Sequence, residues 1–416
     1  MFSVDRRVLA LAIARMADSA GNSFLIIVLP LYITSGVITG NSFGLTATAI
    51  TGIVLSLFGF LNSFTQPFAG YLSDKSERRK VFILLGLGIL AVTNFSFSLA
   101  SSYPALVAIR AVQGIGVAFT IPCTIALVND LASDENRGGN MGVFNTFRLL
   151  GFGAGPIAAG ALVHNGPYTV AGIHMTGFES AFYIASLGAL ISFALVTLLV
   201  SDPEQADAEA ADDFSITILG SRGGLDPIFT LALASLFMAI SIALISTLET
   251  TINRRLGQNE LWFGIEFAAF VLAQVALQTP IGRATDRYGR KQFIVAGLVL
   301  LIPATVVQGF VGTPVEMLIA RLVQGVAGAL VFAPALALAG DIARKGQSGT
   351  QLSLLTMAFG LGTAIGPLSS GFLVKFGFQV PFEVGGVLAA LGAALVYTQV
   401  EETVTKPPDA RPTPQD

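Results

Sequence analysis

The sequence predicts an all-α integral membrane protein with twelve transmembrane helices, arranged as two pseudo-symmetric six-helix bundles. Three features of the chain predict this fold. Of its 416 residues, 53% are hydrophobic and 12% are charged, against roughly 25% charged in soluble domains. The apolar residues fall in about a dozen stretches, most of them long enough to cross a ~30 Å hydrocarbon core as a helix of ~20 residues. Several short patterns also occur twice, about half the chain apart.

The apolar stretches follow one another with short connections. In the first half they are 8–33, 47–72, 81–101, 104–128, 140–164 and 178–200, and in the second half 227–252, 260–281, 291–312, 315–340, 351–374 and 379–399. The first stretch is too long for a signal peptide and has no small-residue cleavage pattern. It is therefore expected to be the first spanning helix.

The domain boundaries follow from an acidic, Ala-rich interruption between the sixth and seventh spans. We expect an N-terminal bundle at 1–200, a solvated linker at 201–225 and a C-terminal bundle at 226–400. The polar, Pro-rich tail at 401–416 is expected to be disordered.

Lys and Arg are distributed unevenly between the spans. Sixteen of the 23 lie on the side of the N-terminus and three on the opposite side, while four lie within spans, namely Arg15, Arg110, Arg148 and Arg321. Because cytoplasmic loops carry an excess of Lys and Arg, both termini are expected to be cytoplasmic, with the chain in the plasma membrane.

The repeated patterns keep a nearly constant offset of 211 or 212 residues. The matching pairs are Gly70/Gly282, Asp74/Asp286, Arg110/Arg321, Asp130/Asp341 and Gly155/Gly366. A duplication inside a hydrophobic chain predicts two bundles that face each other with a site between them.

The loops after the second and eighth spans carry a repeated, charged pattern that runs from Gly70 to Lys80 and from Gly282 to Lys291. It resembles the signature loop of the major facilitator superfamily, which implies that superfamily's fold. Charge pairs in such a loop can latch two bundles in one state and release them in another. The expected cytoplasmic gate comprises Gly70, Asp74, Arg78, Asp130, Gly282, Asp286, Arg290 and Asp341. The alternative is a positively charged loop with incidental acids.

Span five is rich in glycine at fixed spacings. Gly142, Gly151, Gly155, Pro156 and Gly160 resemble the antiporter motif of the drug:proton antiporters within the superfamily. Small residues allow helices to pack closely in a membrane. A generic small-residue helix interface is the alternative.

Ionisable residues inside a membrane span are costly and mark functional sites. Asp18 lies near the middle of span one, and Arg15 lies one turn earlier on the same face. The resemblance implies a proton-binding acid in this helix, whereas a permanent ion pair of Asp18 with Arg15 or Arg148 is the alternative. The candidate proton-coupling residues are Asp18, Arg15, Arg110, Arg148 and Glu266.

Polar residues also form a stripe in span eight. Glu266, Phe270, Gln274 and Gln278 recur every four residues on one helix face. The candidate substrate-cavity residues are Asn22, Asn62, Gln66, Gln113, Glu249, Gln274, Gln278 and Phe270. Glu249 is expected to face water at the outer end of span seven. The alternative for the stripe is a structural hydrogen-bond ladder between helices.

The remaining patterns exclude several classes of function. The chain has no phosphate-binding loop and no nucleophile–base arrangement, and His164 and His174 have no carboxylate or thiol at metal spacing. No enzymatic activity, cofactor, metal, nucleic acid or obligate protein partner is therefore expected.

The resemblance implies a secondary active transporter whose partners are the lipid bilayer, a small-molecule substrate and protons. We expect proton-coupled efflux of small amphipathic or hydrophobic compounds by alternating access. A proton-coupled transporter of a polar metabolite, such as a sugar or an organic acid, is the alternative. A membrane sensor would need a sizeable extramembrane domain, for which the connections between spans are too short.

Overall fold

The structure is a computed structural model that describes residues 6–76, 78–131, 137–202, 218–220, 224–342 and 348–403. Within these residues, twelve helical segments are long and apolar enough to cross a membrane. The predicted all-α fold with twelve spans is therefore confirmed. Most of the predicted linker, and the tail from residue 404 onward, lie outside the described residues.

The first half of the chain contains six long helices and one β-hairpin. Its elements are α1 (Arg6–Thr34), α2 (Ala47–Ser76), α3 (Arg79–Ser96), η1 (Phe97–Leu99), α4 (Tyr103–Asp130), α5 (Arg137–Asn165), β1 (Tyr168–Val170), β2 (Ile173–Met175) and α6 (Gly177–Leu199). The two strands pair antiparallel, with Thr169 opposite His174.

The second half repeats the six long helices, adds a short helix, α8, and has no hairpin among its described residues. Its elements are α7 (Pro227–Ala243), η2 (Leu244–Thr247), α8 (Glu249–Leu256), α9 (Glu260–Tyr288), α10 (Arg290–Val306), η3 (Val307–Gly309), α11 (Pro314–Ile342), α12 (Ser348–Leu373), η4 (Val374–Phe376) and α13 (Val380–Gln399).

One predicted span boundary is wrong. Span seven was expected to continue to residue 252, but it ends at Thr247, and Glu249 begins a separate helix, α8. The residues that follow Glu249 are mostly polar, and the predicted span was extended through them as far as the single apolar residue Ile252.

The repeated signature pattern was predicted to lie in loops, but most of each copy is helical and only a short turn separates the two helices that carry it. Gly70 lies within α2, and α9 continues past Gly282 to Tyr288. The α9 helix ends at Gly289, whose φ of 105° favours glycine. Between Pro280 and Gly289 the sequence contains no further proline, so nothing interrupts the helix there.

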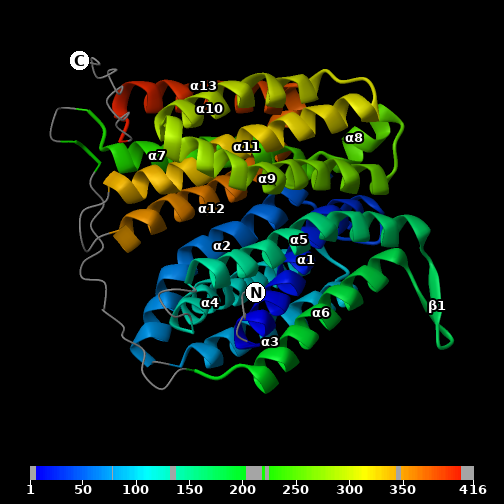
Figure 1. Cartoon of the computed structure of the whole chain (residues 1–416). Helices are drawn as coiled ribbons and strands as arrows, with labels where there is room; N and C mark the ends of the chain where they lie inside the picture. Colours follow the sequence, from blue (N-terminus) through cyan, green and yellow to red (C-terminus); the bar gives the residue numbers. More distant parts are fainter. Residues whose placement is uncertain are drawn as a thin grey trace, which may run out of the picture.

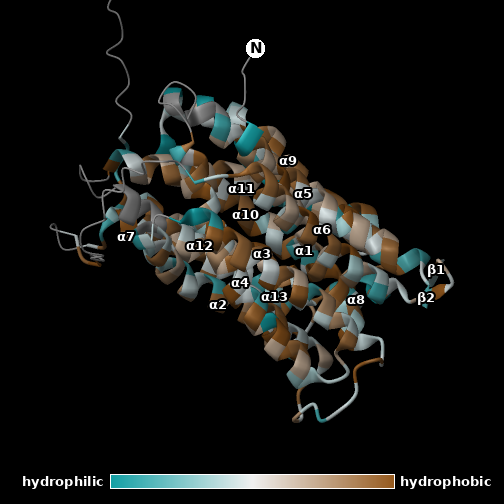
Figure 2. Ribbon diagram, turned by 90° about the horizontal axis from the view of Figure 1, so that it is seen from below, coloured by the Kyte–Doolittle hydropathy of each residue, from teal (hydrophilic) through white to brown (hydrophobic). Residues whose placement is uncertain are grey.

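The two halves lie one above the other (Figure 1). The hairpin β1–β2 projects from one end of the molecule, here called the hairpin side, and the opposite end, where α2 ends and α3 begins, is called the linker side. Hydrophobic residues dominate the helices, while hydrophilic residues gather at the hairpin (Figure 2). This distribution is typical of helices that face lipid.

The halves contact each other through the pairs α2–α12 and α5–α9. The tightest contacts lie toward the hairpin side, where a Cβ on Gly52 would lie 2.6 Å from the backbone oxygen of Pro367, and one on Gly160 would lie 2.5 Å from that of Glu260. His164 of α5 also lies 3.5 Å from the Glu260 carboxylate. Within the described residues, ion pairs on the linker side join helices of the same half.

Candidate functional site

Asp18 of α1 is 6% exposed and forms an ion pair with Arg15, one turn earlier on the same helix. The spacing of three residues places both side chains on one face of α1. The predicted pairing with Arg15 is therefore present in the structure, and the bond joins the Nη1 of Arg15 to the Oδ2 of Asp18.

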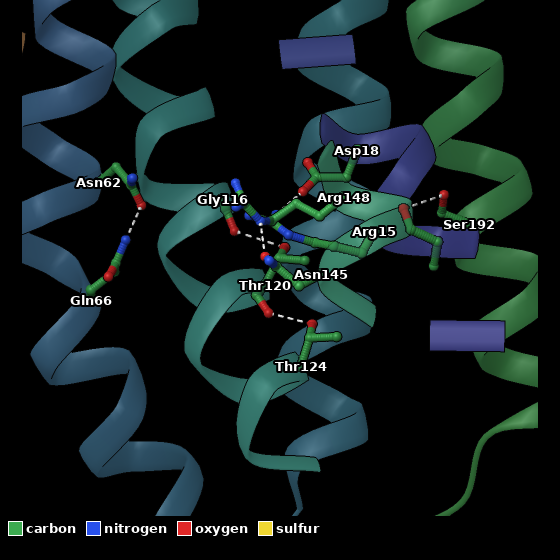
Figure 3. Close-up of polar contacts among 11 residues, drawn as sticks. Arg15, Asp18, Asn62, Gln66, Gly116, Thr120, Thr124, Asn145, Arg148 and Ser192 are labelled. Carbon is green, nitrogen blue, oxygen red and sulfur yellow. Dashed lines mark hydrogen bonds and ion pairs between the residues drawn. The ribbon is translucent and has the colours of Figure 1, made fainter. Parts of the chain in front are cut away.

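Arg148 of α5 lies beside this pair (Figure 3). Its Nε donates a hydrogen bond to the Oδ1 of Asn145, at 2.9 Å. The alternative Asp18–Arg148 ion pair is not among the ion pairs of the described residues. Arg148 lies within electrostatic reach of Arg15, so a second guanidinium group adds positive charge next to the Arg15–Asp18 pair.

The glycines of span five determine how closely α5 approaches α1. A Cβ on Gly151 would collide with the backbone oxygen of Met16, and one on Gly155 would lie 2.6 Å from that of Ala20. These two contacts lie on either side of Asp18 along α1. Gly142 differs, because an added Cβ there would meet no described heavy atom within 4 Å.

A small cavity adjoins Asp18, with free space on the order of one water molecule. Asn22, Phe58, Asn94 and Gln113 contribute to its lining. The predicted residues Asp18, Asn22 and Gln113 are therefore brought together. Asn22 Oδ1 is buried without a hydrogen-bond partner.

Asn94 was missed by the sequence analysis. Its Oδ1 accepts a hydrogen bond of 2.6 Å from Gln113, and Gln113 Oε1 accepts one from Arg110. The available signal was an amide inside span three, 19 residues before Gln113. We call the set Arg110, Gln113, Asn94 and Phe58 the Arg110 network, because the guanidinium of Arg110 lies 4.3 Å from the Phe58 ring centroid.

The second half repeats this arrangement as the Arg321 network, which comprises Arg321, Gln324, Thr305 and Phe270. Arg321 donates to Gln324, Gln324 donates to Thr305 at 3.1 Å, and Arg321 lies 4.7 Å from the Phe270 centroid. Thr305 was also missed. Arg110 and Arg321 are 2% and 1% exposed, and neither forms an ion pair within the described residues. A stacked aromatic ring and an amide therefore replace a carboxylate partner.

The two networks differ in one acidic residue. Glu266 of α9 is fully buried and lies within electrostatic reach of Arg321, whereas its repeat position in the first half is the buried Val54. The Oε2 of Glu266 accepts a hydrogen bond of 3.1 Å from Gln258. The second half thus holds a carboxylate where the first half has an apolar side chain.

The expectation that Glu249 faces water is wrong. Glu249 is 0% exposed, and neither of its carboxylate oxygens has a hydrogen-bond partner. Its position at the first residue of a separate helix, α8, turns the side chain into the protein rather than toward solvent. The neighbouring amides Asn253 and Gln258 were missed, since they lie in a stretch that reads as a polar loop.

The other predicted cavity residues lie apart from Asp18. Gln66 donates to Asn62 along α2, at 2.9 Å. Gln274 is half-buried and approaches Gly328 of α11, and Gln278 is half-buried further along α9. Asn62 and Gln66 thus form a hydrogen bond within one helix, whereas the ladder alternative expected hydrogen bonds between helices.

At the linker side, each half contains one equivalent ion pair. Arg79 lies 2.8 Å from Asp130, and Arg290 lies 2.6 Å from Asp341. The predicted gate residue Arg78 is exposed and does not make this contact, because Arg79 is the residue 211 positions before Arg290. The side chains of Asp74 and Asp286 lie outside the described part of the structure.

The gate glycines do not form close contacts here. A Cβ on Gly70 or Gly282 would meet no described heavy atom within 4 Å. Among the described residues there is therefore space for a side chain at both positions.

Comparison with known proteins gives relatives along the whole chain. An uncharacterized MFS-type transporter of Methanocaldococcus jannaschii is 30% identical over 178 residues, which span 42% of this chain and 46% of that relative, less than half its length. The multidrug resistance protein MdtG of Enterobacter lignolyticus is 23% identical over 377 residues, 89% of this chain and 86% of the relative.

Solved structures share the fold. A bacterial homologue of the human lysosomal transporter Spinster, in an inward-facing and occupied conformation, has a TM-score of 0.77 at 14% identity and covers 94% of this chain and 95% of its own. A D-xylose–proton symporter also has a TM-score of 0.77 at 14% identity, covering 96% of this chain and 99% of its own.

The family model described as Major Facilitator Superfamily matches residues 11–230 and 229–415, once for each half. The match in two copies corresponds to the repeated Arg110 and Arg321 networks. With twelve spans in two equivalent halves, the chain is a multi-pass membrane protein that belongs to the Major Facilitator Superfamily.

Proposed function

We propose that this protein exports small amphipathic or hydrophobic compounds across the plasma membrane in exchange for protons, by alternating access. The observation that carries the proposal is the buried Arg15–Asp18 pair, against which Gly151 and Gly155 of the antiporter-like motif place α5 in close contact. A carboxylate at this depth is costly unless it has a role. Relatives named multidrug resistance proteins support export as the direction.

The proposed orientation places the linker side in the cytoplasm, as the distribution of Lys and Arg predicts. The halves then meet most tightly on the external, hairpin side, at the contacts of Gly52 and Gly160. In this orientation the structure corresponds to an inward-facing state. Parting of these contacts, with closure at the linker side, produces the opposite state.

In the proposed mechanism, Asp18 is the proton site. Binding of a proton removes its attraction to Arg15 and frees the guanidinium groups of Arg15 and Arg148 to repel each other. The protonated and deprotonated forms thereby favour different packing of α1 on α5. A compound and a proton that favour opposite states of the same carrier are exchanged across the membrane.

The test is proton flux in proteoliposomes under an imposed pH gradient, after addition of lipophilic cations and neutral drugs. The wild type is expected to show drug-triggered proton flux, and Asp18→Asn is expected to lose it. Asp226→Asn is the matched control, because Asp226 caps α7 through its side chain and Asn caps helices equally well. This control is expected to retain full flux.

Two results contradict the proposal. Flux with a sugar or an organic acid, but with none of the drugs, assigns the protein to transport of a polar metabolite. Equal loss of flux in Asp18→Asn and Asp226→Asn shows that removal of any carboxylate inactivates the protein, so that Asp18 has no special role.

A further inference from the structure

A second buried acidic cluster lies on the hairpin side, apart from Asp18. It consists of Glu249 and Asn253 on α8, Gln258 in the following turn and Glu266 on α9. Gln258 Nε2 lies 3.1 Å from both the Oδ1 of Asn253 and the Oε2 of Glu266. These bonds join α8 to α9 around the carboxylates, and we call the four residues the hairpin-side cluster.

The hairpin-side cluster has too few hydrogen atoms for its acceptors. Four buried oxygens have no partner, namely both carboxylate oxygens of Glu249, the Oε1 of Gln258 and the Oε1 of Glu266. The only donor without a partner in the cluster is the Nδ2 of Asn253. An ionised carboxylate only accepts hydrogen bonds, whereas a protonated one also donates. Protons on the glutamates would therefore supply the missing donors.

No cation in the described structure neutralises the pair. Arg321 is within electrostatic reach of Glu266 but donates its hydrogen bond to Gln324. Arg254 and Arg255 of α8 are exposed, and Arg255 stacks on the Phe378 ring at 4.7 Å. An ion pair with either arginine is therefore absent.

The other elements around α8 are α1, η2 and α9. At its hairpin-side end α1 carries Tyr32, whose hydroxyl is directed to the first half and donates to the backbone oxygen of Ala100 at 3.0 Å, and η2 carries no ionisable residue. On α9, the carboxylate of Glu260 lies near His164. Burial raises the pKa of Glu249 well above its usual value, and the charges of Glu260 and Glu266 raise it further.

The cluster lies directly behind the contact that closes the hairpin side. Glu260 and Gly264 of α9 lie between Gln258 and Glu266 in the sequence, and both pack against α5. A Cβ on Gly264 would lie 2.5 Å from the backbone oxygen of Pro156. The cluster also adjoins a second contact between the halves, because α1 packs against α8. Opening of the hairpin side would separate α1 from α8 and thus open the layer that covers the cluster. Closure of this contact removes the carboxylates from water, which strongly disfavours their ionised forms.

We propose that Glu249 and Glu266 form a proton-binding pair whose protonation is required for the two halves to close on the hairpin side. Each glutamate takes up one proton from the hairpin side while that side is open, two protons in all, and closure buries the neutral form. This site deepens the proposed proton coupling and rests on it for its role in transport. Its effect on conformation can be measured without any transported compound.

The experiment measures distances between spin labels in the full chain, reconstituted in nanodiscs, by double electron–electron resonance across a pH series. Labels at Asn165→Cys and Lys375→Cys report on opposite halves at the hairpin side, in a background with the single native cysteine replaced, Cys123→Ser. The closed, short-distance population of the labelled parent is expected to fall as pH rises. The ratio of closed to open is expected to change by up to about tenfold per pH unit for each linked proton.

The variants Glu249→Gln and Glu266→Gln, and their combination, are expected to stay closed at high pH, because an amide mimics the neutral acid. Glu249→Asp keeps a titratable group and is expected to retain a pH response. Glu383→Gln is the matched control, since Glu383 is an exposed glutamate at the start of α13 on the same side. It is expected to behave like the parent.

Three results would overturn the proposal. These are an unchanged pH response in the double glutamine variant, no response in the labelled parent, or a response that Glu383→Gln removes equally. Closure driven by added Na⁺ at constant pH, and lost in the glutamine variants, would identify a cation site in place of a proton site. Failure of drug-driven flux alone would contradict the export function and leave the conformational result intact.

Discussion

At the residue scale, identical residue types take different roles according to what faces them. Gly142, Gly151 and Gly155 all lie on α5, yet only the last two meet α1 at distances that exclude a side chain. The motif therefore combines positions that must be glycine with a position that could hold a larger residue. Whether glycine is required depends on how close the neighbouring helix lies, and not on α5 itself.

This difference gives a prediction for α5. Gly151→Ala is expected to lower thermal stability, by about 1–3 kcal/mol, because the added methyl group collides with the backbone of α1 beside Asp18. Gly142→Ala is expected to leave stability unchanged or raise it by up to about 1 kcal/mol, since Ala is a better helix former. Melting of the two purified variants in detergent, next to wild type, measures the effect. Equal melting temperatures for both would contradict the close approach of α1 and α5.

The candidate site could be predicted in part at this scale. Asp18, Arg110, Arg321 and Glu266 stand out in the sequence because charge inside an apolar span is rare. Asn94 and Thr305 do not, since single polar residues in membrane helices are common. Their role depends on hydrogen bonds from Gln113 and Gln324 on the neighbouring helix.

At the element scale, an acidic side chain caps the start of the third span in both halves. An acid three residues after the last helix of each half accepts hydrogen bonds from the first backbone amides of the third span of that half. Asp202 accepts from the amide of Lys80 at 2.9 Å. Glu402 accepts from those of Arg290 and Lys291, each at 2.9 Å. Helix N-termini have unsatisfied amides that such acids can cap.

These caps predict a local effect on exchange. Glu402→Ala is expected to speed amide hydrogen exchange at the start of α10, with a loss of about 1 kcal/mol of local stability, and to leave the start of α3 unchanged. Asp202→Ala is expected to do the reverse. Hydrogen–deuterium exchange with mass spectrometry resolves the two segments. Faster exchange at both helices in either variant would show general destabilisation instead of a cap.

The turns before these helices explain a change of offset in the repeat. The offset is 212 residues at Asp74/Asp286 and 211 at Arg79/Arg290, so the first half has one more residue between them. In the second half Gly289 alone makes the turn with a positive φ. With one more residue in the first half, Arg79 rather than Arg78 corresponds to Arg290, and Arg79 is the residue that pairs with Asp130.

At the scale of the whole molecule, contact between the halves is concentrated toward the hairpin side. Gly160 lies at the end of α5, where its missing side chain lets the backbone of α9 approach. Because the two backbones are so close here, a larger residue at Gly160 is expected to shift the equilibrium between the two states of the carrier.

Gly160→Leu is therefore expected to shift the molecule toward the state open on the hairpin side, because a Cβ there would lie 2.5 Å from the Glu260 backbone oxygen. Gly142→Leu makes the same change on the same helix at the linker side, where the structure leaves space, and is expected to keep the parent distribution. Spin-label distances between Asn165→Cys and Lys375→Cys measure the shift. A short-distance population in Gly160→Leu equal to that of the parent would contradict this contact's role.

The sequence by itself determined the twelve helices, the duplication and the depth of the buried charges. Hydropathy and repeat spacing are local properties, and a membrane helix satisfies its own backbone hydrogen bonds. Only the tertiary structure decided that Glu249 is buried, that Asp18 pairs with Arg15 rather than Arg148, and that Gly151 faces α1 while Gly142 does not. These facts depend on how each helix is rotated and packed against segments far away in the chain, which no local pattern records.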